Sequence, residues 1–431
     1  METGTIVRSR NASFSKSEKL GFVSPRPLII PNRLPCEIQR HCESCRYVNR
    51  DYEESFKSKY EAGLKVLEEK NLLGKARLIP PIAAERKFEY RSTMKLAVRQ
   101  GADGTLKIGL FRPGSHHVVE IAECPLHLRP LKKLLSALQS FLQTAQSNGQ
   151  FHPWDEANHK GDLRYVVARC SHLTEDIQVS FVVPNEEKKI FFRDLVRDLR
   201  NSGLKIDSCY LNINPEPGNQ IFGHSFVKLA GQDQLRVKLN EIPIQVSPGS
   251  FLQVNPWQAD RIYNRIMQFA GNVERGELAW DLYCGVGPIA LSLAKQGYRV
   301  WGVEENPQAI EDAIQNAQRN DFAPAQLNFS SGLLEEHLKE IPAWANTPSL
   351  IVLNPSRRGL ADNVREKLSE VLASCKTLHS VLYLSCEVKT LARDLEGLLA
   401  SGARLKQLEA FDMFPHTEKM EWLAVITPPQ G

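Results

Sequence analysis

Long hydrophobic runs are missing from this chain of 431 residues. No stretch reaches the roughly 18 consecutive apolar residues that a membrane-spanning helix needs. The opening residues 1–8 also lack the apolar core of a secretory signal peptide. We therefore expect a soluble cytoplasmic protein. Charge of one sign is equally scarce, because 54 Lys and Arg face 50 Asp and Glu. This near balance permits a nucleic-acid partner without requiring one.

Internal repeats and low-complexity tracts are absent as well, so the chain does not read as a repeat array. The nine cysteines are an odd number in a chain without an export signal. That count argues against a disulfide framework and for metal or catalytic roles for some of them. Apolar residues make up 42% of the chain, enough to build ordinary cores, and the length favours two or three domains.

The pattern along the chain divides it into three regions. Residues 1–30 are rich in Ser, Arg, Lys and Pro and predict a flexible basic tail. Residues 31–240 mix alternating runs with helical stretches, which predicts an α+β domain. In residues 241–431 strands alternate with helices, which is typical of a doubly wound parallel sheet in a Rossmann-like α/β domain. The strands expected there are 278–282, 299–303, 350–353, 381–385 and 422–427, with a helix over 256–270.

A glycine-rich loop follows the first of these strands, and its Gly285 and Gly287 lie where such a fold brings backbone close to a ligand. Glu304 ends the next strand, about 20 residues on, where an acid accepts hydrogen bonds from ribose hydroxyls. The loop alone fits a nicotinamide-dependent dehydrogenase as well as an enzyme that uses S-adenosylmethionine. Asp281 favours the sulfonium cofactor, because its negative charge would repel a pyrophosphate.

Three further polar residues lie near strand ends. Asn354 follows the apolar strand 350–353, at the edge where open α/β sheets bind ligands. Cys386 lies just before a predicted helix, whose N-terminus favours the thiolate form. The alternative for a lone cysteine is a packed core residue. Glu421 is a candidate acid-base group, and its alternative is a solvated surface acid.

Three segments together resemble the RNA uracil-5 methyltransferase family. They are Asp-Leu-Tyr-Cys-Gly-Val-Gly at 281–287, Leu-Ser-Cys leading into Thr-Leu-Ala-Arg-Asp-Leu at 384–395, and Met-Phe-Pro-His-Thr at 413–417 with Glu421 four residues on. The likeness spans about residues 33–430. It implies a class I methyltransferase domain that binds S-adenosylmethionine, with contacts at Gln253, Tyr283, Glu304 and Asn354.

The resemblance implies methyl transfer to carbon 5 of a uridine in RNA, with Cys386 as nucleophile and Glu421 as base. Carbon 5 of uracil is too poor a nucleophile to take a methyl group unaided. Addition of a thiolate to carbon 6 turns the ring into an enolate that can take it. A base then removes the proton left on carbon 5, and the thiolate departs. Because a helix hides both carbons in its stack, we expect an extruded loop nucleotide.

The target RNA expected from the resemblance is 23S ribosomal RNA. Asn354 and the absence of an N-terminal oligonucleotide-binding barrel are similar to the branch called RlmC, which modifies that RNA. Ser356, Glu387 and Val388 depart from the usual family pattern, which has a second proline after Asp-Pro and an Asn-Pro after the catalytic cysteine. The alternatives are a transfer RNA enzyme with the same catalytic residues and a non-catalytic RNA-binding protein with the same fold.

Four cysteines form a second candidate site, with the spacing Cys36-x5-Cys42-x2-Cys45 and Cys124 far downstream. Such compact spacing wraps thiolates around an inorganic centre, and four soft ligands suit zinc or an iron-sulfur cluster. The family resemblance implies a 4Fe-4S cluster with these ligands. Because all four positions are cysteine, we expect a structural role, in which the cluster joins loop 36–45 to the strand near residue 124.

The densest basic and aromatic segment spans residues 86–99. Phosphates and an unstacked base would suit it, and the alternative is a strand with one solvated face. Its members are Arg86, Lys87, Phe88, Tyr90, Arg91, Lys95 and Arg99. A loop at residues 110–117 is similar to a family loop and is expected near the substrate.

Overall fold

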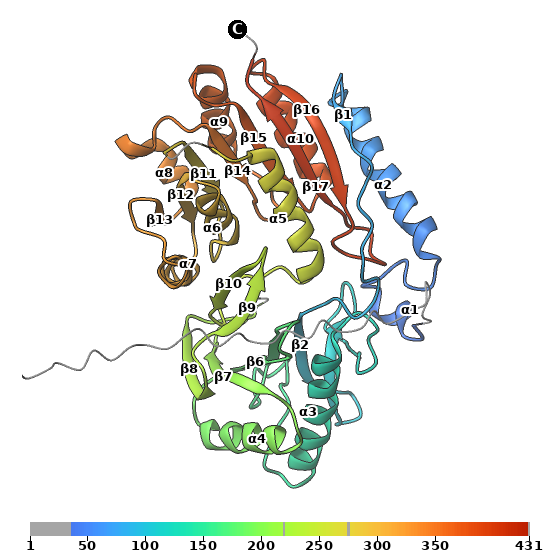
Figure 1. Cartoon of the computed structure of the whole chain (residues 1–431). Coiled ribbons are helices and arrows are strands. Elements are labelled where there is room, and N and C mark those ends of the chain that lie inside the picture. The colour runs from blue at the N-terminus through green and yellow to red at the C-terminus, as the bar shows by residue number, and fades with distance from the viewer. Residues whose placement is uncertain (1–35, 219, 274–275, 430–431) are drawn as a thin grey trace, which may run out of the picture.

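The computed structural model describes residues 36–218, 220–273 and 276–429, so the tail expected at residues 1–30 lies outside the described residues. The described residues form an eight-stranded sheet, a seven-stranded sheet and a two-stranded hairpin. In Figure 1 the eight-stranded sheet lies in the upper half of the molecule and the seven-stranded sheet in the lower half. The hairpin of β9 (Leu235–Leu239) and β10 (Ile242–Val246) lies between them.

The eight-stranded sheet has the order β1-β16-β17-β15-β14-β11-β12-β13. Its central strands β11 to β15 are parallel, and the chain reverses its direction of winding between β11 and β14. Ligands bind at such a reversal, beyond the carboxyl ends of the strands. The strands are β1 (Arg77–Leu78), β11 (Leu278–Leu282), β12 (Arg299–Glu304), β13 (Leu327–Ser331), β14 (Leu350–Leu353), β15 (Ser380–Ser385), β16 (Arg404–Phe411) and β17 (Glu421–Thr427).

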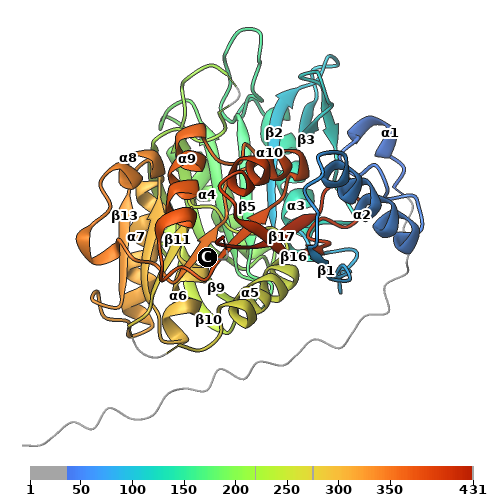
Figure 2. The same cartoon turned by 90° about the horizontal axis from the view of Figure 1, so that it is seen from above.

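Helices cover both faces of this sheet (Figure 2). One face packs against α5 (Pro256–Ala270), α6 (Pro288–Lys295) and α7 (Pro307–Arg319). The other packs against α2 (Tyr52–Glu69), α8 (Leu334–Lys339), α9 (Asp362–Ser374) and α10 (Val388–Leu399), with a short 3-10 helix at Ala343–Ala345 beside them. Because a hydrophobic core occupies each face, polar side chains can gather only at the strand ends.

The five strands predicted for this domain are confirmed to within one residue at each end. The prediction of a doubly wound parallel sheet is wrong at one edge, where β17 runs antiparallel to both β15 and β16. The reason is the connection, because β16 returns into β17 through the loop 412–420 without a crossover helix. The sheet is therefore mixed, and β13 and β16 join it without having been predicted.

Strand β1 is part of the eight-stranded sheet, and helix α2 packs on that sheet. The domain boundaries predicted from the sequence had assigned both to the domain 31–240. Leu78 of β1 pairs with Leu408 of β16. Gly63 of α2 lies so close to Trp422 of β17 that a methyl group on its Cα would stand 2.1 Å from the indole ring. The prediction is wrong for this stretch, because the period of an amphipathic helix does not say which sheet its apolar face covers.

The seven-stranded sheet has the order β4-β3-β2-β5-β6-β7-β8 and is antiparallel except between β6 and β7. Helices α3 (Arg129–Ser147) and α4 (Lys189–Asn201) pack on one face. The opposite face carries only a small apolar cluster that includes Ala97 and Tyr165. The strands are β2 (Thr93–Gln100), β3 (Leu106–Phe111), β4 (Val118–Glu120), β5 (Tyr165–Cys170), β6 (Ile177–Val183), β7 (Ile206–Ile213) and β8 (Ser225–Gly231), and α1 (Gln39–Cys42) precedes them.

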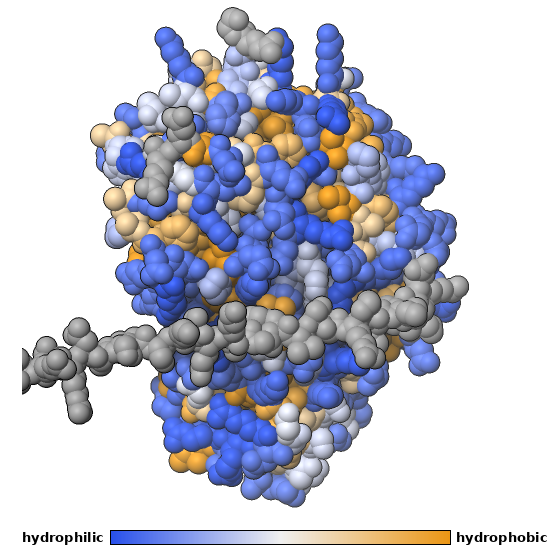
Figure 3. Space-filling view, viewed as in Figure 1, coloured by the Kyte–Doolittle hydropathy of each residue, from blue (hydrophilic) through white to orange (hydrophobic). Residues whose placement is uncertain are grey.

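Hydrophilic residues predominate on the face shown in Figure 3, and hydrophobic ones lie among them in small groups. No helix within the described residues is both long and apolar enough to cross a membrane. Single exposed apolar side chains are ordinary on protein surfaces. Phe251 stands out because 63% of it is exposed while it lies two residues from Gln253, a predicted cofactor contact.

Candidate active site

Three parallel strands, β11, β14 and β15, end at one edge of the eight-stranded sheet. Leu353 pairs with Leu282 on one side and with Tyr383 on the other. Asn354 continues this pairing, since its N–H donates to the Leu282 carbonyl at 3.2 Å. Cys386 directly follows the end of β15. The glycine-rich loop, the Asn-Pro turn and the predicted nucleophile therefore meet at the edge where ligands bind.

Glu421 reaches the same edge because β17 is antiparallel to β15. Ser385 pairs with Trp422, so the next step of the register sets Cys386 opposite Glu421. A parallel β17 would have placed Glu421 at the far edge of the sheet. The carboxylate is buried, with 3% of the residue exposed, which excludes the alternative of a solvated surface acid. Cys386 and Glu421, which the sequence motifs suggested as a catalytic pair although 35 positions separate them, are therefore neighbours in the structure.

Burial is the main influence on the acidity of the Cys386 thiol. Burial, and after it the charge of the nearby Glu421, raise the pKa of this thiol to about 11, although the Arg357 guanidinium opposes both by its charge and by a hydrogen bond to the sulfur. The sequence predicted that a helix N-terminus would favour the thiolate. Helix α10 begins at Val388, two residues later, and burial outweighs its dipole. The helix N-terminus therefore does not lower the pKa of this thiol in the free protein, and the role of Cys386 as nucleophile stays a prediction.

Burial also raises the pKa of Glu421, to about 8, and Arg357 again opposes the shift. A carboxyl group with this pKa exchanges its proton near neutral pH, as a general acid-base group must. Cys386, Glu421 and Arg357 thus form one electrostatic unit, in which the single cation favours the charged form of both acids. Any charge that a bound ligand adds here would change which of the two holds a proton.

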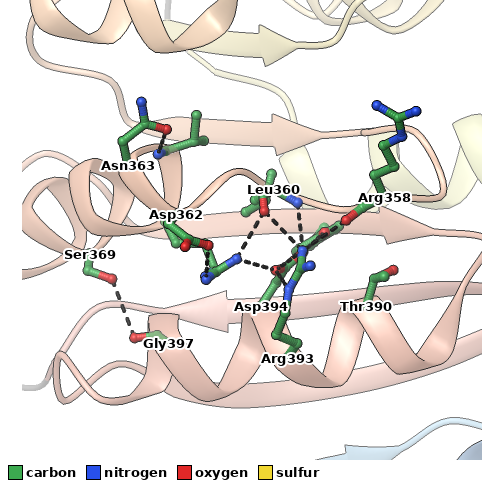
Figure 4. A network of polar contacts seen from close by, with 12 residues as sticks. Arg358, Leu360, Asp362, Asn363, Ser369, Thr390, Arg393, Asp394 and Gly397 are labelled. Atoms are coloured by element: carbon green, nitrogen blue, oxygen red, sulfur yellow. Dashed lines mark hydrogen bonds and ion pairs between the residues drawn. The ribbon is translucent and has the colours of Figure 1, made fainter.

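Arg357 is the functional candidate that sequence reasoning missed. The available signal was its position three residues after Asn354, in the polar turn at the same strand end. Figure 4 shows how that turn is anchored to α10. The buried Asp394 carboxylate accepts hydrogen bonds from the Leu360 N–H at 2.8 Å and from Arg393, whose guanidinium also donates to the Arg358 carbonyl at 2.9 Å. The turn is therefore a fixed support for Arg357.

The cofactor loop and Glu304 lie together as predicted. The Gly285 N–H donates to the Glu304 carboxylate at 3.1 Å, and the Asn306 N–H donates to its other oxygen at 3.0 Å. Gly285 has a positive φ of 56°, and a Cβ there would meet open space. Such a cradle fits a ligand that approaches the backbone closely. Gly287 instead serves packing, since a Cβ there would stand 3.2 Å from the Phe329 ring.

Asp281 supports a cationic ligand at this loop. The residue is fully buried, and neither carboxylate oxygen has a hydrogen-bond partner within the described part of the chain. Burial raises its pKa to about 7, and Glu304 adds to the shift. Two acids close to the loop create a negative site, which suits a sulfonium and disfavours a pyrophosphate. Tyr283 follows the strand with a positive φ of 66°, so the chain turns sharply into the loop.

Gln253 lies outside the sheet, in the segment that joins β10 to α5. Its backbone carbonyl accepts from the Ser92 hydroxyl at 3.5 Å, and its side chain has no hydrogen bond to the described residues. Asn255 caps α5 by accepting from the Gln258 N–H at 3.3 Å. Among the described residues no hydrogen bond joins Gln253 to the glycine-rich loop, so its assignment as a cofactor contact stays a prediction.

Cys36, Cys42, Cys45 and Cys124 line one common cavity beside α1. Burial raises the pKa of Cys45 to about 12, the neighbouring Arg91 opposes that rise, and the other three thiols add to it. No three His, Cys, Asp or Glu side chains in the described ranges converge closely enough to hold a single metal ion. The predicted 4Fe-4S cluster stays a prediction. The partly buried Arg91 is a cation that would offset the negative charge of cysteine ligands.

The expectation that Phe88 and Tyr90 offer their rings to RNA is wrong, because both residues are fully buried. Phe88 stacks on His416 with 4.2 Å between ring centroids, and the Tyr90 hydroxyl donates to the Pro415 carbonyl at 3.0 Å. The alternation of basic and aromatic residues there reflects a packed segment. Lys95 does reach the surface, on the face of the seven-stranded sheet that no helix covers.

Comparison with known proteins gives consistent results. Residues 219–427 match the family model described as tRNA (uracil-5-)-methyltransferase. Two proteins named as uncharacterised RNA methyltransferases, from Halalkalibacterium halodurans and Listeria monocytogenes, are each 31% identical to this chain. Those alignments cover 98% of this chain, with 90% and 89% of the two relatives. The crystal structure of a Pyrococcus abyssi tRNA (uracil-54, C5)-methyltransferase with S-adenosyl-L-homocysteine has a TM-score of 0.71, 25% identity, and coverage of 92% and 86%.

Fold, strand-end loop and relatives together define the chain as an RNA methyltransferase that depends on S-adenosylmethionine. More narrowly, it belongs to the RNA uracil-5 methyltransferase family. The resemblance read from three short motifs is confirmed at this level. Membership of this family rules out the alternative that the glycine-rich loop belongs to a nicotinamide-dependent dehydrogenase. It also favours an enzyme over the alternative of a non-catalytic RNA-binding protein.

Proposed function

We propose that this protein methylates carbon 5 of a specific uridine in RNA through a covalent adduct with Cys386. The observation that carries the proposal is the register of β15 and β17, which sets Cys386 opposite Glu421 at the strand edge that holds the cofactor loop. We assign the contacts to S-adenosylmethionine to Gln253, Tyr283, Gly285, Gly287, Glu304 and Asn354. When bound, this cofactor supplies a methyl group on a positively charged sulfur.

In the proposed reaction the Cys386 thiol first loses its proton to solvent. The thiolate then adds to carbon 6 of the uracil, and the ring electrons move onto carbon 5 and the neighbouring carbonyl oxygen. Carbon 5 would take the methyl group that bound S-adenosylmethionine supplies, and the electron pair of the broken bond would stay on the sulfur. The Glu421 carboxylate then removes the proton from carbon 5. That electron pair re-forms the ring double bond as the carbon–sulfur bond breaks, which releases the thiolate and the 5-methyluridine.

Arg357 suits a role in the first step. Burial and the charge of Glu421 raise the pKa of the Cys386 thiol to about 11 in the free protein. A guanidinium at hydrogen-bond distance is the group that would stabilise the thiolate once RNA displaces water from the site. The same cation favours an ionised Glu421, which the last step requires. We therefore infer that Arg357 contacts the reacting sulfur.

We infer that the substrate is 23S ribosomal RNA, with the target uridine extruded into the site. Transfer RNA is the second candidate, because the matching family model and the Pyrococcus abyssi enzyme both carry tRNA in their descriptions. The exposed Phe251 supports RNA binding, since an exposed aromatic ring can stack on an unpaired base.

The test compares transcripts of 23S ribosomal RNA and of transfer RNA in which 5-fluorouridine replaces uridine. Fluorine on carbon 5 cannot be removed as a proton, so the adduct of a reacting enzyme persists on a denaturing gel. We expect a covalent complex with ribosomal RNA and none with transfer RNA. A complex with transfer RNA alone would select the second candidate, and failure to trap either RNA while methylation proceeds would contradict the covalent mechanism.

We also propose a 4Fe-4S cluster at Cys36, Cys42, Cys45 and Cys124. The shared cavity supports it, since each thiolate of such a cluster binds its own iron and the four need not converge on one point. Anaerobic purification followed by iron and sulfide analysis tests the assignment. We expect about four of each per chain. Stoichiometric zinc without iron would contradict it, and the Cys45→Ser variant is expected to lose iron.

A further inference from the structure

The loop 412–420 leads from β16 into Glu421, and the side chain of Lys59 in α2 occupies its centre. Lys59 lies more than 350 residues from the loop in sequence. Its ammonium group shares its three N–H donors among four oxygens, all of them in this loop. They are the Asp412 carboxylate and the backbone carbonyls of Phe414 at 3.1 Å, Thr417 at 3.4 Å and Lys419 at 3.2 Å.

Burial makes these contacts obligatory. The Lys59 side chain is 2% exposed and the Asp412 side chain is 0% exposed. Tyr52 of the same helix donates to the second Asp412 oxygen at 2.8 Å. A buried ammonium without its partners carries a large free-energy cost, because water cannot reach it. Any loop conformation that moves the carbonyls away from Lys59 is therefore strongly disfavoured.

The loop 412–420 is linked to both proposed catalytic residues through their neighbours in the chain. Lys419 forms an ion pair with Glu387, the residue that follows Cys386. Two residues after Lys419 the chain reaches Glu421. On the other side of Glu421, Trp422 stacks on Tyr60 of α2 with 5.8 Å between ring centroids. Helix α2 thus fixes the backbone both before and after Glu421 from a single direction.

We propose that Lys59 is a positioning residue for Glu421, which holds the loop 412–420 so that the carboxylate faces carbon 5 of the methylated adduct. The inference rests on the proposed function, in which Glu421 removes the proton from carbon 5. Addition of Cys386 and methyl transfer need no base at Glu421. Loss of Lys59 therefore slows only the last step, in which the proton passes to Glu421 and the carbon–sulfur bond breaks.

The experiment measures single turnover on unmodified substrate RNA with labelled methyl groups, and a denaturing gel separates the methylated protein–RNA adduct from released methylated RNA. We expect Lys59→Met to accumulate the adduct and to release product up to roughly 100-fold more slowly. Glu421→Gln should show the same trapped species. Lys57→Met, an exposed lysine of the same helix, is the matched control and should release product at the wild-type rate.

Two outcomes of this single-turnover experiment would overturn the proposal. One is release at the wild-type rate from Lys59→Met, and the other is a parallel fall of adduct and product, which would indicate general misfolding. Because the single variant leaves Asp412 buried without its cation, the double variant Lys59→Met/Asp412→Asn repeats the test without that unpaired charge. If Glu421→Gln itself released product normally, the base assignment would fail first, and the two failures are thereby distinguished.

Hydrogen exchange in the free protein supplies a readout that does not depend on activity. Peptides covering residues 412–421 should exchange faster in Lys59→Met than in the wild type and in Lys57→Met. Peptides from α3, on the other sheet, should be unchanged in all three. Unaltered exchange of residues 412–421 in Lys59→Met would show that Lys59 does not hold the loop and would contradict the proposal.

Discussion

The two large sheets of this protein differ in which of their surfaces remain uncovered by helices. The eight-stranded sheet is covered by helices on both faces, so its reactive side chains lie at the carboxyl edge of β11, β14 and β15. The seven-stranded sheet has helices on one face only, and the segment 246–250 covers part of its other face by accepting hydrogen bonds from Arg169 and Gln178. The uncovered part carries Lys95, Phe111 and Tyr165 around a groove of about 210 Å³. A sheet covered on both faces restricts chemistry to its edge, whereas a partly covered sheet leaves some of one face for binding.

This difference predicts that mutations in the two sheets will affect different measured quantities. Changes at the edge of the eight-stranded sheet should alter rates with bound RNA, because the groups there contact the reacting atoms. Changes on the open face of the seven-stranded sheet should alter RNA affinity and leave the rate at saturating RNA unchanged. Of the five predictions below, three test this division and two test the stability of the eight-stranded sheet.

The largest effect is expected for Cys386→Ala, which removes the nucleophile. We expect no detectable methylation and no covalent complex with 5-fluorouridine RNA, since carbon 5 has no other source of electrons. The matched control is Cys375→Ala, a cysteine at the end of α9 that the proposed reaction does not use. Activity retained by Cys386→Ala would show that the strand edge at Cys386 does not carry the reaction.

The second prediction concerns pH and Glu421. Because the carboxylate must be ionised to act as base, adduct resolution should fall about tenfold for each unit below its pKa of about 8. Single-turnover rates across the pH range measure this slope. The Glu421→Gln variant should be slow at every pH, and a wild-type slope in that variant would assign the titration to another group.

The same pKa shift has a consequence for stability. The folded pKa of Glu421 is raised from 4.5 to about 8, so folding favours the protonated form. This contribution is complete below 4.5 and is lost as the pH rises through about 8. Relative to Glu421→Gln, the free energy of unfolding of the wild type should therefore decline across that window. Chemical denaturation at several pH values measures the difference.

A smaller effect is expected at the contact between α2 and β17. Gly63→Ala would place a methyl group 2.1 Å from the Trp422 ring, and such overpacking costs about 1–3 kcal/mol. Gly397→Ala in α10 is the control, because its Cβ would have 3.5 Å to the nearest atom and should be tolerated. Urea unfolding compares the two. Equal stability of both variants would show that α2 does not pack tightly against the catalytic strand.

The smallest effect is expected on the open face. Lys95 is exposed and has no acidic partner in the described residues, so its ammonium group is available to a phosphate. Lys95→Met should lower the slope of log affinity against log salt by about one and weaken RNA binding, with the rate at saturating RNA unchanged. Lys133→Met, on the helix-covered side, is the control. If Lys95→Met changed the methylation rate at saturating RNA, the open face of the seven-stranded sheet would contribute to the reaction as well as to binding, contrary to this prediction.

Much of the fold and site could be read from local patterns. The strand 350–353 is a continuous apolar run ended by Asn-Pro, and such a run predicts a buried parallel strand without reference to any partner. The glycines and acid at residues 285, 287 and 304 have fixed spacing because one βαβ unit joins them. Patterns could not show that Phe88 and Tyr90 are buried, since alternation gives the period of a segment and not what covers it.

The sequence by itself determined the chemistry of this protein: a thiol, a late carboxylate, a glycine-rich loop and four cysteines are properties of residues and their spacing. Tertiary structure alone decided which groups act on one another. The antiparallel return of β17 sets Glu421 opposite Cys386, Arg357 adds a cation to both, and α2 reaches across the chain to place Lys59 in the loop 412–420. Such contacts join residues far apart in the chain, and they depend on strand direction and on which faces are covered, which no local pattern encodes.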